Sequence, residues 1–246
     1  MIKLTDMTIS CLEKYNPSKE QLIELIDLLI SAGADFIEIP VSALLKIGEL
    51  NPFGKYVLRI DSPGEADKYS GFGRYVCKKN GFASKGNVIT EIQANDIREI
   101  NLLSQYGKLE NVRIVGFDDI LNHDYISAFS NLKSKVSGKI ELCPENKYFC
   151  ATSIAVEWIL FGEQEVVVSF AGINSKAAFE EVMMALRFEK RHKPRISSSI
   201  FPQISELIEK ITSVKLSKRH NMCEHFCPEQ IGNEQKILIG NSSVKH

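Results

Sequence analysis

Two strand–helix units follow one another in residues 139–189, KIELCPENKYFCATSIAVEWILFGEQEVVVSFAGINSKAAFEEVMMALRFE. Residues 139–143 and 166–170 are short apolar runs, a pattern typical of buried strands. Residues 151–161 and 176–189 are longer and carry apolar side chains at helical spacing. Because two strands joined by a helix pair in parallel, this stretch predicts an α/β fold built on a parallel sheet.

The same alternation extends towards the N-terminus and raises the number of expected strands to eight. Further apolar runs typical of strands lie at residues 4–9, 36–40, 56–60, 74–78, 87–93 and 112–117. Helical patterns separate several of them, at residues 17–34, 96–106 and 125–136. Eight parallel strands can close on themselves, so the sequence predicts a (β/α)8 TIM barrel, with an open doubly wound sheet as the alternative.

The sequence changes character after the last helix of the predicted barrel. Residues 193–199 have the composition of a linker, residues 204–211 repeat like one more helix, and the remainder is polar. We therefore expect a barrel domain in residues 1–192 and a truncated linker with a C-terminal tail in residues 193–246. A length of 246 residues suits one barrel, which typically needs about 250 residues.

Composition and charge exclude several classes of protein. Hydrophobic residues make up 44% of the chain, enough for one sizeable core, and the formal net charge is −1. This charge offers no bulk attraction for nucleic acid or an anionic membrane. We expect no membrane-spanning helix and no signal peptide, because Asp6 interrupts the N-terminal apolar run. The six scattered cysteines favour a reduced, cytoplasmic setting over a disulfide scaffold.

Three parts of the chain carry a family pattern. They are residues 6–14 (DMTISCLEK) with the later GADFIEI, residues 143–153 (CPENKYFCATS) continuing to 171–182 (AGINSKAAFEEV), and residues 224–232 (EHFCPEQIG). They resemble the homocitrate synthase and isopropylmalate synthase family, the DRE-TIM metallolyases. That family has D-T-T-L-R-D-G-E-Q in the first strand and H-x-H-N-D-x-G-x-A-T-A at the seventh. The resemblance implies a TIM barrel that joins acetyl-CoA to a 2-oxo acid.

The residues expected to hold the family's metal ion are altered in this chain. The resemblance implies a divalent metal bound by Asp, two His and Asn, and an Arg that stabilises the oxyanion. Those positions fall on Cys11, Cys143, Glu145 and Phe179 for the metal and on Ser10 for the arginine. The family's downstream H-x-x-G-I-H has no counterpart here. Since Mg²⁺ and Mn²⁺ prefer oxygen donors, and only Glu145 offers one, we expect catalysis to be impaired.

Other residues at the strand ends remain candidates for polar contacts. We predict catalytic roles for Ser10, Glu13 and Asn146, and substrate-binding roles for Glu38, Asp118 and Ser169. Asp118 follows the sixth strand, on the face of the barrel that carries active sites. Solvation of a strand end is an equally good explanation of that carboxylate.

Three interpretations of the cysteines remain open. Cys11, Cys143 and Glu145 could form a rebuilt site for Zn²⁺ or Fe²⁺, because thiolates suit softer metals. The two cysteines could form a disulfide, or they could be small buried residues of a decayed site. A second cluster near the C-terminus, His220, Cys223, His225 and Cys227, is either a zinc site or part of a surface tail.

Two function classes follow from these observations. The first is a catalytically impaired, accessory relative of the acyl-CoA:2-oxo acid Claisen-condensing enzymes. Such a protein would act as a regulatory subunit beside an active synthase, or bind a small 2-oxo or hydroxy acid without converting it. The second is an active homocitrate, isopropylmalate or citramalate synthase, or a lyase, using a divalent metal (Zn, Mn or Mg) in a rebuilt site and acetyl-CoA as co-substrate. By analogy with the family we expect a homo- or hetero-dimer.

Overall fold

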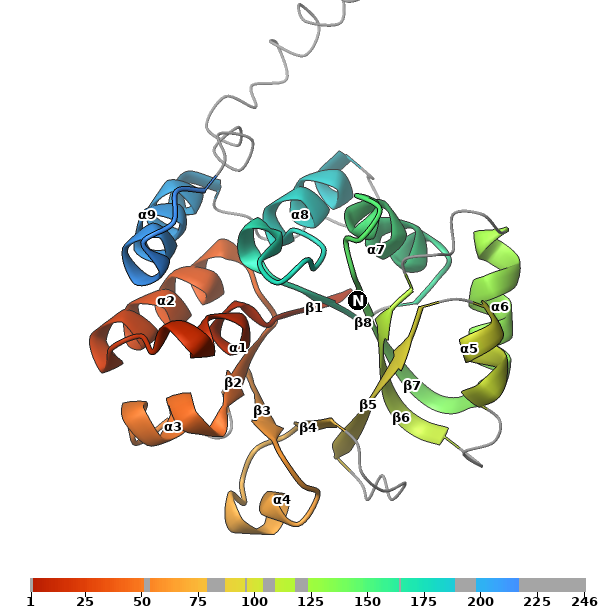
Figure 1. Ribbon diagram of the computed structural model, residues 1–246, viewed down its shortest axis with the longest axis horizontal. Coiled ribbons are helices and arrows are strands. Elements are labelled where there is room, and N and C mark those ends of the chain that lie inside the picture. The colour runs from red at the N-terminus through yellow and green to blue at the C-terminus, as the bar shows by residue number, and fades with distance from the viewer. Residues whose placement is uncertain are drawn as a thin grey trace, which may run out of the picture.

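Eight parallel strands close into a barrel in the computed structural model of this chain (Figure 1). The structure describes residues 2–50, 54–78, 87–95, 97–103, 109–117, 124–163, 165–188 and 198–216. The strands are β1 Lys3–Asp6, β2 Phe36–Pro40, β3 Tyr56–Ile60, β4 Tyr75–Lys78, β5 Val88–Ala94, β6 Leu109–Gly116, β7 Val136–Pro144 and β8 Glu165–Val168. Each pairs with its neighbour in the chain, and β1 also pairs with β8, Thr5 standing opposite Val167. The predicted TIM barrel is confirmed, and the open sheet is not the fold.

Helices surround this ring on the outside (Figure 1). They are α1 Thr8–Leu12, α2 Lys19–Ala32, α3 Val41–Ile47, α4 Glu65–Lys68, α5 Ile97–Leu102, α6 Tyr125–Lys135, α7 Ala151–Leu160, α8 Phe179–Phe188 and α9 Phe201–Thr212. Between β3 and β4 the helix is a single turn, α4. Within the described chain, no helix has the length and apolar character needed to cross a membrane.

Local sequence explains why α2 forms where it does. Ser18 and Gln21 make a capping box, in which each side chain accepts a hydrogen bond from the other residue's backbone N–H. Gly33 ends the helix in the left-handed conformation, at φ 109°, which only glycine adopts without strain. Leu25 and Leu29 lie on the face buried against the barrel.

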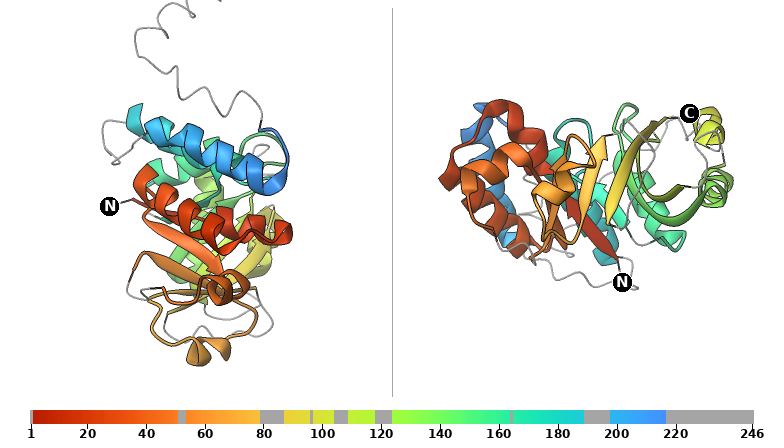
Figure 2. Two further views of the ribbon diagram at one scale, coloured as in Figure 1. Left: turned by 90° about the vertical axis from the view of Figure 1, so that its left-hand side faces the viewer. Right: turned by 90° about the horizontal axis from the view of Figure 1, so that it is seen from below.

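The last helix, α9, packs against the barrel instead of extending away from it. It lies alongside α2, as Figure 1 and the left-hand view of Figure 2 show. Phe201 at its start is buried and makes edge-to-face contacts with Phe170 and Phe179. Ile204 and Ile208 are also buried in the same core. Residues from the segment expected to be a linker and tail thus complete the outer layer of the barrel.

The middle of the barrel is filled by ion pairs, although TIM barrels usually fill this space with branched apolar residues. The charged side chains are Glu38, Arg59, Arg74, Glu91, Arg113, Glu141 and Glu165, one each from β2, β3, β5, β6, β7 and β8, with Arg74 directly before β4. Arg59 donates to Glu38 and Glu91 at 2.6 Å, and Arg113 donates to Glu141 at 2.7 Å and also to Glu38. Hence each of these buried charges has an opposite charge beside it, which burial requires.

Candidate functional site

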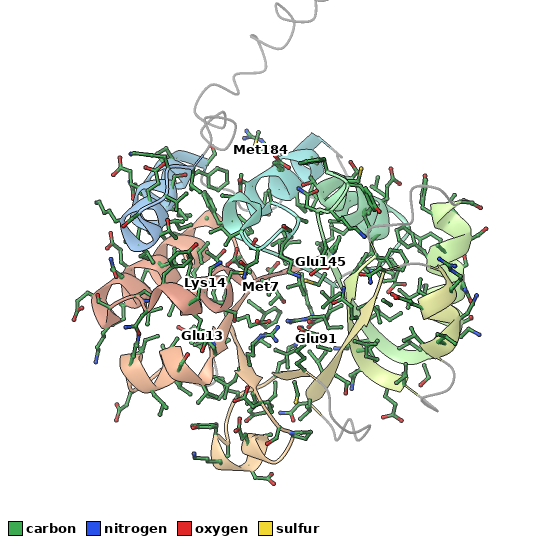
Figure 3. The ribbon with its side chains drawn as sticks, viewed as in Figure 1. Met7, Glu13, Lys14, Glu91, Glu145 and Met184 are labelled. Carbon is green, nitrogen blue, oxygen red and sulfur yellow. The ribbon has the colours of Figure 1, made fainter. Side chains whose placement is uncertain are left out.

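The candidate site lies at the carboxyl ends of β1, β6, β7 and β8, the face where TIM barrels carry their active sites. A small buried cluster occupies it, made of Met7, Cys11, Val115, Cys143 and Val167. In Figure 3, Met7 and Glu145 lie towards the centre of the ring of strands, whereas Glu13 lies out over the helices near α1. Three residues predicted to bind metal, Cys11, Cys143 and Glu145, therefore reach one end of the barrel.

Glu145 is the polar centre of this site. It follows directly after β7, where its backbone N–H donates to the Gly116 carbonyl at 2.8 Å. Its Oε1 accepts a hydrogen bond from the Lys176 ammonium at 2.6 Å, and its Oε2 accepts one from Gln93 Nε2 at 3.2 Å. The Lys176 side chain is only 9% exposed. A buried lysine and a carboxylate therefore neutralise each other at the mouth of the barrel.

Lys176 owes its position to the turn between β8 and α8. Asn174 and Ser175 have positive φ angles of 55° and 54°, which turn the chain back over the strand ends. Residues 145 and 176 then form an isolated antiparallel bridge, which sets the two side chains next to each other. The predicted helix of residues 176–189 therefore starts three residues later, at Phe179.

Gly116 allows Gln93 to approach Glu145. Its φ of 107° lies in the left-handed region, and a Cβ there would lie 2.4 Å from Asn95 Oδ1 and 2.8 Å from Gln93 Nε2. A side chain here would push the Gln93 and Asn95 amides aside, and the positive φ favours glycine whatever the space.

Both cysteines of the site are protonated thiols at neutral pH. Burial raises the pKa of Cys143 to about 11, even though Lys176 and Arg113 act in the opposite direction. Burial also raises the pKa of Cys11, with a further contribution from the charge of Glu38. Each residue is almost inaccessible, at 2% exposed or less. The sulfur of Cys143 lies 3.8 Å from that of Met7, so these thiols pack like small apolar side chains.

The donor set does not fit the hard divalent metal that the family resemblance implies. Phe179, at the position of the asparagine ligand, is a fully buried phenyl ring. Glu145 is neutralised by Lys176, and Cys11 and Cys143 offer sulfur, which a hard ion such as Mg²⁺ binds poorly. Among the residues that the structure describes, no three His, Cys, Asp or Glu side chains are grouped so as to hold a metal ion. We assign no step to a metal, and the rebuilt soft-metal site stays a hypothesis.

The predicted catalytic residues do not converge on one point. Ser10 has a buried hydroxyl with no hydrogen-bond partner among the residues that the structure describes. Glu13 accepts a hydrogen bond from Ser42 on the exposed side of α1 and α3. Asn146 accepts a hydrogen bond from the Ala151 N–H at 3.1 Å, which satisfies the first turn of α7.

The predicted substrate-binding residues also have structural partners. Glu38 is completely buried; burial would raise its pKa, but Arg59 and Arg113 outweigh burial and lower it to about 2. Ser169 donates to the Ile173 carbonyl at 2.8 Å. Asp118 and the cluster His220, Cys223, His225 and Cys227 lie outside the described residues.

Sequence reasoning missed Lys176, Gln93 and the interior arginines. One signal was available for Arg59 and Arg113, since each lies between two apolar residues inside a strand. Lys176 gave no such signal, because a lysine before a helix is ordinarily solvated.

No family model matches the chain. Among curated proteins, it is 25% identical to the homocitrate synthase omega subunit of Clostridium pasteurianum, covering 98% of this chain and 81% of that protein. It is 26% identical to 2-isopropylmalate synthase 2 of Caldanaerobacter subterraneus subsp. tengcongensis, covering 66% of this chain and 51% of that protein.

Solved structures agree with these relatives in fold. A hydroxymethylglutaryl-CoA lyase from Pseudomonas aeruginosa superposes with a TM-score of 0.66 at 15% identity, over 92% of this chain and 98% of that one. These similarities support the resemblance to the DRE-TIM metallolyases. An HMG-CoA lyase from Acinetobacter baumannii, in complex with coenzyme A and 3-methylmalate, gives a TM-score of 0.65 at 12% identity, over 88% and 92% of the two chains. The chain thus shares the barrel fold of these lyases, whereas the residues at the end of its barrel differ from the metal-binding pattern that the resemblance implies.

Proposed function

We propose that this barrel is an accessory subunit of an acyl-CoA:2-oxo acid Claisen-condensing synthase and does not itself catalyse the condensation. One observation carries the proposal: the Lys176–Glu145 ion pair lies among the residues that resemblance assigns to the metal. A synthase of this type needs a cation that binds the 2-oxo group and polarises its carbonyl. Here Glu145 already neutralises Lys176, the cation at the mouth of the barrel.

The surrounding residues weaken the reaction further. Ser10, at the position of the family's arginine, has an uncharged hydroxyl that is buried and has no hydrogen-bond partner in the described part of the chain. Loss of one fixed oxyanion contact typically reduces the rate by about 10²–10³-fold, or roughly 3–4 kcal/mol. Neither protonated thiol can act as a base near neutral pH. Together these changes support a binding role instead of turnover.

The relatives support a partner and a class of ligand. The C. pasteurianum relative is named as the omega subunit of homocitrate synthase, which describes one component of a larger enzyme. The A. baumannii lyase of the same fold holds a small dicarboxylate, 3-methylmalate, together with coenzyme A. We infer that this chain pairs with an active synthase-type subunit and that small 2-oxo or hydroxy acids are its ligands.

Reconstitution tests the subunit role. The chain is mixed with a catalytic synthase-type subunit purified from the same source, and the mixture is measured by light scattering after size exclusion and by condensation rate. We expect a complex with a changed rate or a changed response to product. Two separate peaks, with the catalytic subunit's rate and inhibition unchanged, would refute the subunit role.

The alternative is an active synthase or lyase with a rebuilt metal site. The presence of Cys11 and Cys143 in one small buried cluster favours this alternative. A bound metal ion would deprotonate such thiols on binding. Stoichiometric zinc or iron in reduced, untagged protein, lost in a Cys143→Ala variant, would support this alternative and contradict our proposal.

A further inference from the structure

The Lys176 ammonium carries more hydrogen-bond donors than the described structure uses. An ammonium group has three N–H donors. Glu145 Oε1, at 2.6 Å, is its one acceptor among the described residues. The side chain is 9% exposed, so little solvent reaches the remaining donors. A buried cation in this state favours a further anionic or carbonyl oxygen beside it.

The position of Glu145 shows that the space between Lys176 and Gln93 accepts a carboxylate. Its two carboxylate oxygens are held by different donors, Lys176 on Oε1 and Gln93 on Oε2 at 3.2 Å. The two donors come from opposite parts of the chain, the β8–α8 turn and the end of β5. A fixed cation and an amide therefore already form a two-point clamp around one carboxylate.

The walls beside this clamp are apolar. Met7, Val115 and Val167 are buried there, with Ile173 packed against them. Such a wall suits the methylene chain of a small organic acid and does not suit a hydrated ion.

We propose that Lys176 and Gln93 form a metal-independent binding site for the carboxylate of a small organic acid, and that Glu145 occupies this site when no acid is bound. The inference rests on the proposed function, because a barrel that binds an acid without converting it needs a cation but no Lewis acid. The ammonium of Lys176 supplies the positive charge, and a divalent ion close to it would be repelled.

Because Glu145 and the ligand compete for Lys176, two variants should change the affinity for the ligand in opposite directions. In a Glu145→Gln variant the ammonium loses its resident anion, so an added carboxylate should bind more tightly. In a Lys176→Met variant the cation is gone and binding should be lost. Lys210→Met is the matched control, since Lys210 is exposed on α9, far from the clamp in sequence and on another element.

The measurement is calorimetric titration of the full chain with 2-oxoglutarate in the presence of EDTA, after circular dichroism has verified that each variant is folded. We expect wild-type binding near the millimolar range, about −4 kcal/mol, at least tenfold tighter binding by Glu145→Gln, and at least tenfold weaker binding by Lys176→Met. Lys210→Met should match the wild type. Glutarate, which lacks the 2-oxo group, should bind within a few-fold of 2-oxoglutarate because no chelate is formed.

Three results would overturn the site. The first is that Lys176→Met binds the acid as tightly as the wild type. The second is that binding appears only when a divalent metal replaces EDTA. The third is that neither the wild type nor Glu145→Gln binds the acid at 10-fold the expected dissociation constant (about 10 mM). Each of these leaves the subunit role standing, because that role is judged by complex formation with a catalytic subunit and not by acid binding.

Discussion

Replacing Arg113 by methionine should lower the free energy of unfolding by about 3–5 kcal/mol, the usual effect of removing one partner of a buried ion pair. The Arg113 side chain is 0% exposed and contacts Glu38 and Glu141, whose side chains are 0% and 2% exposed. Without it, Glu38 keeps only Arg59, and Glu141 keeps only a 3.3 Å contact with Arg74. Methionine has similar length, so packing is largely preserved and the loss is electrostatic.

Thermal and urea unfolding followed by circular dichroism at pH 7 measure this effect. For a chain of this size, 1 kcal/mol corresponds to roughly 2–4 °C in Tm, so we expect a decrease of about 6–20 °C. Arg59→Met is the matched control: Arg59 shares the partner Glu38 but is 20% exposed, so water can solvate the carboxylates left behind. A decrease for Arg113→Met under about 1 kcal/mol, or one no larger than that of Arg59→Met, would refute the reasoning.

Three further predictions concern the candidate site and its surroundings. Burial raises the pKa of Asp6 to about 7, above its unfolded value of 3.8, so the stability that protonated Asp6 provides is complete below about pH 4 and is lost as pH rises through 7. This pH-dependent decrease in the free energy of unfolding amounts to up to about 4 kcal/mol, and Asp6→Asn should abolish it. Urea midpoints that fall equally between pH 5 and 8 in both proteins would contradict the assignment. Gly116→Ala should displace Gln93 and lower Tm by several degrees, because alanine is strained at a φ of 107° and its Cβ would push the Gln93 amide aside; an unchanged Tm would show that the turn relaxes freely. Cys11 and Cys143 should resist alkylation at pH 7 until the protein unfolds, as read by peptide mass mapping, and labelling within minutes in the folded protein would show that the thiols are accessible.

Hydrophobic periodicity was sufficient to predict the strands and most helices. Eight apolar runs became eight strands because strands of a parallel barrel are covered on their outer side by helices, so their apolar pattern is strong. The errors lie at the ends. The first strand stops at Asp6 and Thr8 begins α1, because the buried Asp6 carboxylate accepts the Thr8 N–H and turns the chain.

The site could be predicted only in part. Family resemblance brought Cys11, Cys143 and Glu145 to one end of the barrel, where the structure has them. It could not indicate that Lys176 neutralises Glu145, since that contact depends on the positive φ angles of the turn before Lys176. Likewise, we predicted that Glu38 binds substrate, but its carboxylate accepts hydrogen bonds from two arginines that lie 21 and 75 residues away in the chain. Pairings over such separations leave no local pattern in the sequence.

The most direct test of the account is release of CoA thiol by the purified chain alone, supplied with acetyl-CoA, a panel of 2-oxo acids and Mg²⁺, Mn²⁺ or Zn²⁺ in turn. Because the cation beside Glu145 is the ammonium of Lys176, the account predicts no substrate-dependent release above the blank with any metal, while the protein remains folded. Release that depends on a 2-oxo acid and a metal, and that Cys143→Ala or Glu145→Ala abolishes, would contradict it and show that these residues form a working metal site.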